Sequence, residues 1–346
     1  MAELPLVSII ILNYNGLRFV ERCIRSVLST DYPNFEVIFV DNKSTDGSPE
    51  LVEKLFGEEK RLKIVKNEKN LGFSGGNNRG IRIARGDYIV LLNNDTEVRP
   101  DWLKQIIAVM EKRDDIGIAQ PVILYMDSDN IIQTLGNNID SILMVVKSVG
   151  KGKKFPAEKL CKMIKTSFPM GACIVLKRSL LKKIGLFDEK FFIYHDDIYW
   201  GLLTWLSGHK VATILTSVIY HYGRATIGRF KFKKIAYYNT ISRLALILKI
   251  YNKLDIFVGL PSFIVLWYAY IAYKAMKMRA PKAILSVLKG YIWTIKNINH
   301  IIKERMKIKK RITKPCYSKF KKILLPNPFC YKKIETILLK KIGIKN

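Results

Sequence analysis

The chain has 346 residues, 49% of them hydrophobic, so it can bury a core in one large α/β domain with a smaller part, or in two modest domains. Its formal net charge of +30 excludes a near-neutral surface and indicates an anionic partner: nucleic acid, acidic lipid or a phosphorylated substrate. The five cysteines are odd in number and lack metal-ligand spacing, which argues against a disulfide framework and against a zinc site.

Strand and helix patterns alternate along the N-terminal third of the chain. Four short apolar runs have the composition of buried strands: residues 7–12, 36–40, 62–65 and 88–92. Helical spacing of apolar residues follows each of them, over residues 17–28, around 49–56, up to about 84, and from 100 to 110. This alternation predicts an α/β fold with a mostly parallel sheet, helices on both faces and right-handed crossovers.

The second half of the chain has a less regular pattern. We expect a strand at residues 172–176, a helix at 196–207, a strand at 211–215 and an amphipathic helix at 237–251. Residues 256–273 then form an apolar run without a charged side chain.

Polar side chains follow three of the N-terminal strands at their C-terminal ends. They are Asn13 and Asn15 after the first strand, Asp41 and Asn42 after the second, and Asn93, Asn94 and Asp95 after the fourth. Because the tips of parallel strands meet at one edge, these groups should line a crevice suited to a nucleotide diphosphate. Asp95 could there ligate Mg²⁺ or Mn²⁺ bridging two phosphates. Taken alone, residues 93–96 also fit a plain turn that closes a strand.

Two common phosphate-binding signatures are missing from the sequence. There is no GxxxxGK[ST] loop, and no G-x-G-x-x-G follows the first strand. An NTPase or an ordinary dinucleotide site is therefore not supported.

Six motifs in this order resemble the family 2 glycosyltransferases of GT-A fold, especially their rhamnosyltransferase-like branch. The motifs lie at residues 7–15, 40–48, 70–80, 91–95, 171–173 and 185–197. The resemblance covers roughly residues 6–225 and implies a Rossmann-like, mostly parallel sheet with helices on both faces. It also implies a nucleotide-sugar donor, a divalent cation and inverting transfer to an acceptor hydroxyl.

The resemblance assigns roles by position. Asp41 should recognise the base or ribose, and Asp95 matches the metal-binding carboxylate of a DxD-type motif, with Asn93 in place of the first Asp. Asp197 matches the general base, and His221 a histidine that approaches the metal or the diphosphate. The remaining donor-binding candidates are Asn13, Asn15, Asn42, Gly72, Asn77, Asn93 and Asn94.

The chemistry supports two of these roles independently. A carboxylate within reach of an acceptor hydroxyl can remove its proton during in-line attack. Asp196 beside Asp197 disfavours double ionisation, which raises one pKa as a base requires, and only Asp197 is expected to point into the crevice. Both could instead be an acidic helix N-terminus. Gly72, Asn77 and His221 likewise fit plain structural roles as a turn, a cap and a core histidine.

Positive charge is concentrated in the C-terminal part. From Lys274 onward there are 21 Lys/Arg and 2 Glu, so this part carries +19 of the total +30. Beside the apolar run 256–273 this favours a re-entrant or in-plane segment on an anionic membrane surface, at the cytoplasmic face of the cell membrane. A membrane span and a buried core helix are the alternatives.

These features together predict four parts. They are a catalytic GT-A domain at residues 1–225, an amphipathic connecting helix at 226–253, an apolar membrane-associated segment at 254–273 and a basic helical tail at 274–346. The predicted function is inverting, metal-dependent transfer of a sugar to a glycan or polyprenyl-linked acceptor, without nucleic acid as a partner. A basic nucleic-acid-binding protein without catalytic activity and a sugar nucleotidyltransferase are the alternatives.

Overall fold

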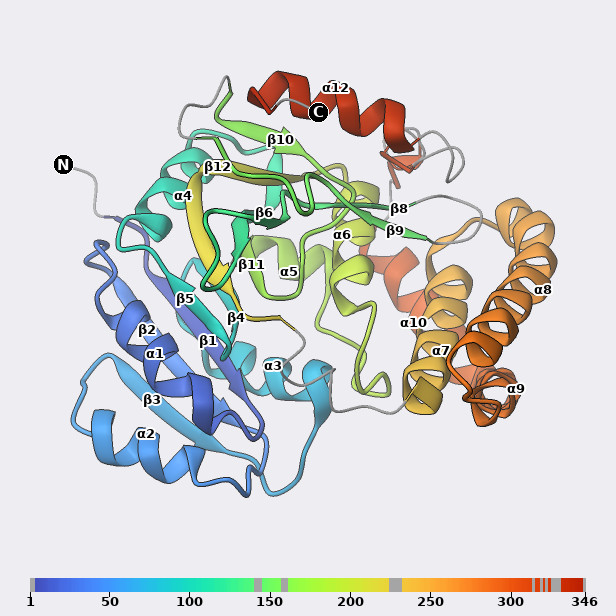
Figure 1. The fold of residues 1–346 in the computed structure, drawn as a ribbon, viewed down its shortest axis with the longest axis horizontal. Helices are drawn as coiled ribbons and strands as arrows, with labels where there is room; N and C mark the ends of the chain where they lie inside the picture. The colour runs from blue at the N-terminus through green and yellow to red at the C-terminus, as the bar shows by residue number, and fades with distance from the viewer. Residues whose placement is uncertain are drawn as a thin grey trace.

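The computed structural model describes residues 4–139, 145–156, 161–223, 232–312, 315–317, 320, 323–324 and 331–344 (Figure 1). The strands are β1 (Val7–Asn13), β2 (Phe35–Asp41), β3 (Leu62–Lys66), β4 (Tyr88–Asn93), β5 (Thr96–Val98), β6 (Ile116–Tyr125), β7 (Ile132–Thr134), β8 (Asn137–Ile139), β9 (Val146–Ser148), β10 (Met163–Lys165), β11 (Cys173–Lys177) and β12 (Lys210–His221). The helices are α1 (Leu17–Leu28), α2 (Ser48–Phe56), α3 (Gly72–Ile83), α4 (Trp102–Glu111), α5 (Arg178–Ile184), α6 (Asp196–Leu206), α7 (Phe232–Ile250), α8 (Lys253–Lys277), α9 (Lys282–Lys296), α10 (Ile298–Arg311) and α12 (Tyr331–Ile342).

The main sheet has the strand order β10-β12-β6-β11-β4-β1-β2-β3. Its β4-β1-β2-β3 half is parallel, as the sequence predicts. The register pairs Asn13 with Asp41 and Leu12 with Asn93, so these three strands end at the same level. Their polar tips therefore meet at one edge of the sheet.

Helices cover both faces of the sheet because successive strand residues point to opposite sides. In β1, Ile9 and Ile11 pack into one core with α1, α2 and α4, whereas Ile10 packs into the other core with α3, α5 and α6. All three side chains are fully buried. The result is the three-layer arrangement expected from the alternating pattern.

The other half of the sheet is mixed. The strand expected at residues 172–176 is β11, which runs antiparallel to both β4 and β6. No strand is predicted from the sequence at β6, which contains Pro121. Opposite Pro121 the register of β12 shifts between Ile214 and Val218, and this irregularity accommodates a residue without an N–H donor. Beyond this irregularity β12 pairs with β6 again from Val218 to His221, so it is longer than the strand expected at 211–215.

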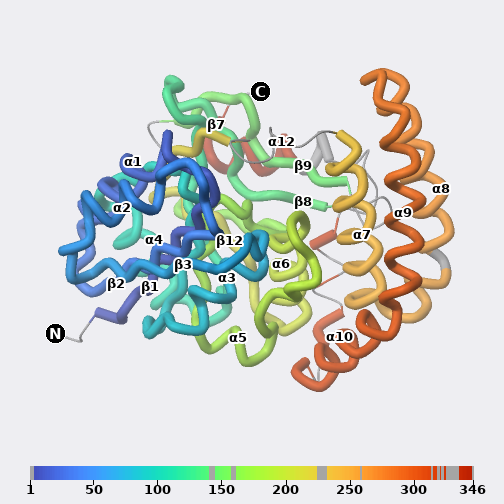
Figure 2. The backbone as a smooth tube through the Cα atoms, turned by 90° about the horizontal axis from the view of Figure 1, so that it is seen from below, coloured from blue at the N-terminus to red at the C-terminus, as the bar shows by residue number. Residues whose placement is uncertain are grey.

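The helices α7, α8, α9 and α10 pack together beside the sheet (Figure 2). They are continuous with the core on the α6 side, because Phe263, Trp267 and Val287 belong to the same buried cluster as Leu203. Buried residues occur along nearly the whole of α7, so the helix is an integral part of this core rather than a one-sided connector. Among the described residues, α8 alone is long and apolar enough to cross a membrane, judged by length and composition.

A buried ion pair joins this helical part to the loop before α6. The Lys249 ammonium in α7 lies 2.6 Å from the Asp188 carboxylate, and His300 Nε2 in α10 lies 2.8 Å from the same oxygen. Phe191 packs at 4.1 Å from the Lys249 ammonium and edge-on against Trp293 of α9. The loop from residue 185 to 195 is therefore held from three helices of the C-terminal half.

We expect Asp188→Asn to destabilise the fold by about 3–5 kcal/mol, because it leaves a buried ammonium without its counter-charge. The Lys249 side chain is only 2% exposed, so water cannot replace the lost partner. Urea denaturation measures the change. The matched control is Asp114→Asn, since Asp114 pairs with Lys177 in full contact with solvent and its loss should leave the midpoint near wild type. Equal midpoints for the two variants would contradict the buried pair.

Candidate active site

Asn13 connects the three polar strand tips. Its side chain is fully buried, and Nδ2 lies 2.9 Å from Asp41 Oδ1 and 2.8 Å from Ser48 Oγ. Its Oδ1 accepts a hydrogen bond of 2.6 Å from Asn94 Nδ2. Because a buried amide is costly to leave unpaired, these bonds fix the ends of β1, β2 and β4 relative to one another.

Asp41 lies inside this network and is only 2% exposed. Its carboxylate also accepts hydrogen bonds from the backbone N–H and the hydroxyl of Ser44, at 2.9 and 2.6 Å. In this arrangement it organises the turn after β2, and its contact with a base or ribose stays a prediction. Asn15 has a positive φ of 52° and accepts a hydrogen bond from the Thr45 N–H at 2.8 Å, so it ties the same turn to β1.

The start of α3 lies next to these strand tips. Asn42 Nδ2 donates to the Gly72 carbonyl at 2.9 Å and is buried. Gly72 has φ +71°, and a Cβ there would lie 2.2 Å from the Phe192 carbonyl oxygen, so only glycine fits. Asn77 Nδ2 donates to the Phe73 carbonyl, while its buried Oδ1 has no hydrogen-bond partner among the described residues.

Asp95 and His221 come together beyond the tip of β4. His221 Nε2 lies 3.1 Å from Asp95 Oδ1, and both side chains are 6% exposed. His221 Nδ1 lies 2.8 Å from Gln133 Oε1, an acceptor that places the proton on Nδ1 and leaves Nε2 to face the carboxylate. Asn93 supports this turn through its backbone, whose N–H donates to the Ala172 carbonyl at 3.0 Å, and its side chain is half-buried.

This pair fits a divalent cation. Neighbouring ligands of an octahedral ion with bonds of 2.0–2.1 Å lie about 3 Å apart, which matches the separation of Asp95 Oδ1 and His221 Nε2. No group of three or more His, Cys, Asp or Glu side chains with metal-site geometry exists within the described part of the chain. The protein would therefore supply two ligands, and donor phosphates and water the others.

Asp196 and Asp197 begin α6 and point to different partners. Asp196 is 7% exposed and accepts a very short hydrogen bond from the Ser74 hydroxyl of α3. Asp197 is half-buried and accepts from the Gly171 N–H at 3.1 Å and from the Ile198 N–H at 2.8 Å. Asp196 is thus directed toward α3. Asp197 instead faces the backbone of Gly171, the residue before Ala172, which bonds to Asn93.

Burial raises the pKa of both carboxyl groups. The pKa of Asp196 rises to about 8, since burial and the neighbouring Asp197 charge outweigh the Ser74 hydrogen bond. The pKa of Asp197 rises to about 6, because burial outweighs the two backbone hydrogen bonds that favour its charged form. At neutral pH Asp196 is therefore mostly protonated and Asp197 mostly ionised.

Backbone strain precedes these aspartates. Tyr194 and His195 both have positive φ, at 78° and 65°, a conformation that non-glycine residues rarely adopt in succession. The Tyr194 hydroxyl and His195 Nδ1 are buried without a hydrogen-bond partner among the described residues. Such strain typically persists at functional sites where surrounding contacts impose it.

The segment of Gly171 and Ala172 connects the two acidic centres. The Gly171 N–H donates to the Asp197 carboxylate, and the carbonyl of the following residue, Ala172, accepts from the Asn93 N–H. Asp95 follows Asn93 by two residues, so the candidate base and the candidate metal ligand share one short piece of backbone.

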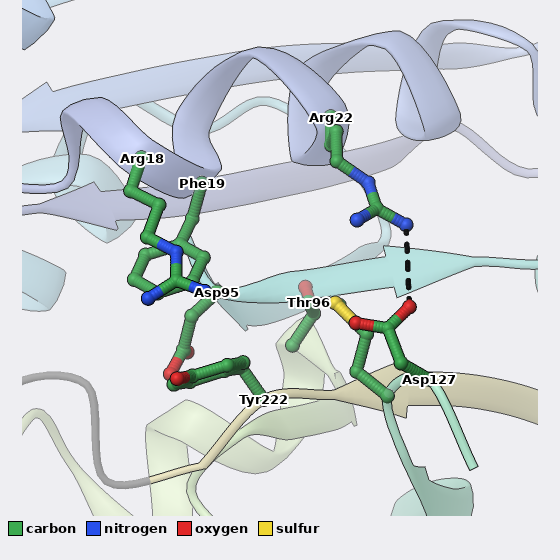
Figure 3. A pocket seen from close by; sticks show the side chains of 8 residues that line it. Arg18, Phe19, Arg22, Asp95, Thr96, Asp127 and Tyr222 are labelled. Atoms are coloured by element: carbon green, nitrogen blue, oxygen red, sulfur yellow. Dashed lines mark ion pairs between the residues drawn. The ribbon is translucent and has the colours of Figure 1, made fainter.

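A pocket beside Asp95 contains residues that are not predicted from the sequence to belong to a site (Figure 3). Arg18 and Arg22 reach into it from α1, and Tyr222 follows His221. The Arg18 guanidinium lies over the rings of Phe19 and Tyr222, at 5.3 and 5.0 Å from their centroids. Arg18 occupies an ordinary exposed position of an amphipathic helix, so only the fold reveals its proximity to the carboxylate.

Buried amides at the ends of parallel strands, a carboxylate–imidazole pair and a second carboxylate are the kinds of group that suit a nucleotide diphosphate with a divalent cation. The sequence model of the family described as Glycosyl transferase family 2 matches residues 8–185, more than half of the chain. The chain belongs to this family.

Individual relatives agree with this assignment. An uncharacterized glycosyltransferase of Haemophilus influenzae is 34% identical over 116 residues, which is 34% of this chain and 36% of that protein. TuaG of Bacillus subtilis, provisionally named as a teichuronic acid biosynthesis glycosyltransferase, is 32% identical over 109 residues, covering 32% of this chain and 43% of its own length. The matches thus span less than half of these curated relatives.

A solved structure shares the fold. The mannosyltransferase PcManGT from Pyrobaculum calidifontis, in complex with GDP-Man and Mn²⁺, superposes with a TM-score of 0.53 at 18% identity. The match covers 89% of this chain and 88% of that one. The fold is therefore the GT-A arrangement predicted from the sequence.

We expect Gly72→Ala to destabilise the protein by more than the backbone strain of an alanine at a positive φ. The added methyl group meets the Phe192 carbonyl, which should cost roughly 1–3 kcal/mol beyond the backbone strain. Gly208→Ala is the matched control, since Gly208 has φ +88° and open space at its Cβ position. Thermal or urea unfolding of the two variants separates the backbone strain from the steric clash. Equal losses of stability would show that Phe192 moves away from the added methyl group without cost.

We expect Asp196→Asn to stabilise the protein increasingly above pH 4. The folded-state pKa of about 8 lies above the ordinary value of 3.8, so the wild type loses stability as pH rises between these values. The variant cannot ionise, and Asn can still accept the Ser74 hydrogen bond. Its advantage should grow by up to about 1.4 kcal/mol per pH unit in this range. Urea unfolding at pH 5 and pH 8 measures it, and a constant difference would refute the raised pKa.

Proposed function

We propose that this protein transfers a sugar from a nucleotide-sugar donor to an acceptor hydroxyl with inversion at the anomeric carbon. One observation carries the proposal: the Asp95–His221 pair and Asp197 are joined through Gly171 and Ala172 in one buried, polar region. Metal-assisted loss of a diphosphate and proton removal from an alcohol require two such centres close together.

The donor side is built around Asp95 and His221. A bound Mg²⁺ or Mn²⁺ would neutralise the charge that develops on the departing diphosphate. Asp95 and His221 would hold this ion, with Gln133 fixing the orientation of the imidazole. Arg18 adds a fixed positive charge to the same pocket.

The acceptor side is built around Asp197. Its carboxylate takes the proton from the acceptor hydroxyl while that oxygen forms a bond to the anomeric carbon. The bond from this carbon to the diphosphate oxygen breaks on the opposite face, and the nucleoside diphosphate leaves. A pKa of about 6 keeps Asp197 ionised at neutral pH and still basic enough to accept the proton.

The finer assignments rest on different supports. A rhamnosyltransferase-like specificity and a lipid-linked acceptor rest on the motif resemblance, and a glycan acceptor is supported by the name of TuaG, which refers to teichuronic acid biosynthesis. PcManGT, bound to GDP-Man and Mn²⁺, supports a nucleotide sugar and a divalent cation. The net charge of +30 supports action at an anionic membrane surface on the cytoplasmic side. Family membership argues against the nucleic-acid-binding and nucleotidyltransferase alternatives.

A donor screen tests the proposal. The protein is incubated with Mg²⁺ or Mn²⁺ and each common nucleotide sugar, and released nucleotide is measured. Asp197→Asn should lower turnover by about 10²–10⁴-fold while changing the donor Kd little, since it removes the base alone. Asp95→Asn should weaken donor binding and raise the metal concentration needed for activity.

Asp114→Asn is the control, because this exposed carboxylate lies outside the site. Full turnover by both Asp95→Asn and Asp197→Asn would disprove the site assignment. If both variants lost donor binding to the same extent, Asp197 would be a donor-binding residue and not the base that removes the acceptor's proton.

A further inference from the structure

The helices α8 and α9 expose large apolar side chains to solvent. We define the α8–α9 apolar face by Leu254, Phe257, Val265, Tyr273, Met276, Leu285, Ile292 and Ile295, which are 53–81% exposed, with Phe257 the most open at 81%. Both helices lie at the edge of the molecule far from β1–β4 in Figures 1 and 2. Large apolar side chains exposed together on two helices that pack against each other mark an interaction site.

The opposite side of α8 is fixed to the protein. Phe263 and Ile271 are buried, and Trp267 Nε1 donates to the Thr240 hydroxyl of α7 at 2.9 Å. The Tyr291 hydroxyl of α9 donates to the Ile264 carbonyl at 2.8 Å. One side of α8 is therefore core and the other is free, which is the geometry of a helix lying along an interface rather than crossing it.

The charges around this face have one sign. Between Asp255 and Glu304 there is no acidic residue, and this stretch contains seven Lys/Arg. Lys277, Lys282 and Lys289 are exposed next to the apolar side chains. A second copy of the chain would bring two such basic rims together, whereas anionic lipid headgroups complement them.

We propose that the α8–α9 apolar face lies in the interface of an anionic lipid bilayer, with α8 parallel to the membrane plane and the basic rim on the headgroups. Crossing the bilayer would carry the Arg243 guanidinium, 4.4 Å above the Trp267 ring, toward the hydrocarbon with α8. The inference deepens the proposed function and rests on it only for the expectation that the acceptor is membrane-borne.

Vesicle sedimentation tests the proposal with the full-length chain. Phosphatidylcholine vesicles with and without phosphatidylglycerol are mixed with wild type, with the double variant Phe257→Glu/Val265→Glu, and with Leu55→Glu. Leu55 is exposed on α2, so it controls for adding a carboxylate at an apolar surface position. Wild type and Leu55→Glu should bind the anionic vesicles equally, and the double variant at least tenfold more weakly.

Several results would overturn the proposal. Wild type that fails to bind anionic vesicles, or a double variant that binds as wild type does, excludes the face. Loss of a wild-type dimer in the double variant, seen by light scattering without vesicles, assigns the face to self-association. Trypsin outside the vesicles should still cleave near Lys309; protection of this region would indicate a span. Because binding is measured without donor and turnover without vesicles, failure of either proposal is distinguishable from failure of the other.

Discussion

The polar groups at the ends of β1, β2 and β4 are buried, and each of them needs a hydrogen-bond partner there. Asn13 bonds to Asp41 on one side and to Asn94 on the other. Since an unpaired buried amide costs free energy, these bonds determine where the turn with Asp95 can lie. His221 lies against Asp95 at this turn, and the Asn93 N–H continues the pairing of β4 with β11 by donating to the Ala172 carbonyl.

A second set of contacts positions Asp196 and Asp197, on the proposed acceptor side. The loop before α6 is pressed between Gly72 of α3 and the helices α7, α9 and α10. These contacts hold Tyr194 and His195 in a strained conformation, so that Asp196 reaches Ser74 and Asp197 reaches Gly171. The C-terminal helices thus contribute to the geometry of the site as well as presenting the apolar surface.

The strands β1 to β4 and the meeting of their polar tips could be predicted from the sequence, because they depend on local patterns. Apolar runs that end in Asn or Asp predict both the strands and the edge of the sheet at which these strands end. Contacts between distant segments could not be predicted in this way. Gln133 meets His221 across 88 positions, and Lys249 meets Asp188 across 61, and neither residue stands out by type or spacing. β6 escaped prediction because Pro121 ordinarily argues against a central strand.

The two acidic centres are assembled from very distant parts of the chain. Ser74 and Asp196 are separated by 122 positions, and His221 stands at the end of β12, the last strand of the sheet in sequence order. Contacts of such long separation form late in folding because their loop-closure entropy is large. A nascent chain that has emerged only as far as α4 already contains all the strands of the parallel half of the sheet. It lacks β11, which pairs with β4, and it contains neither His221 nor the candidate base Asp197. The candidate metal ligands and the candidate base are therefore all present only after the ribosome has synthesised nearly two thirds of the polypeptide.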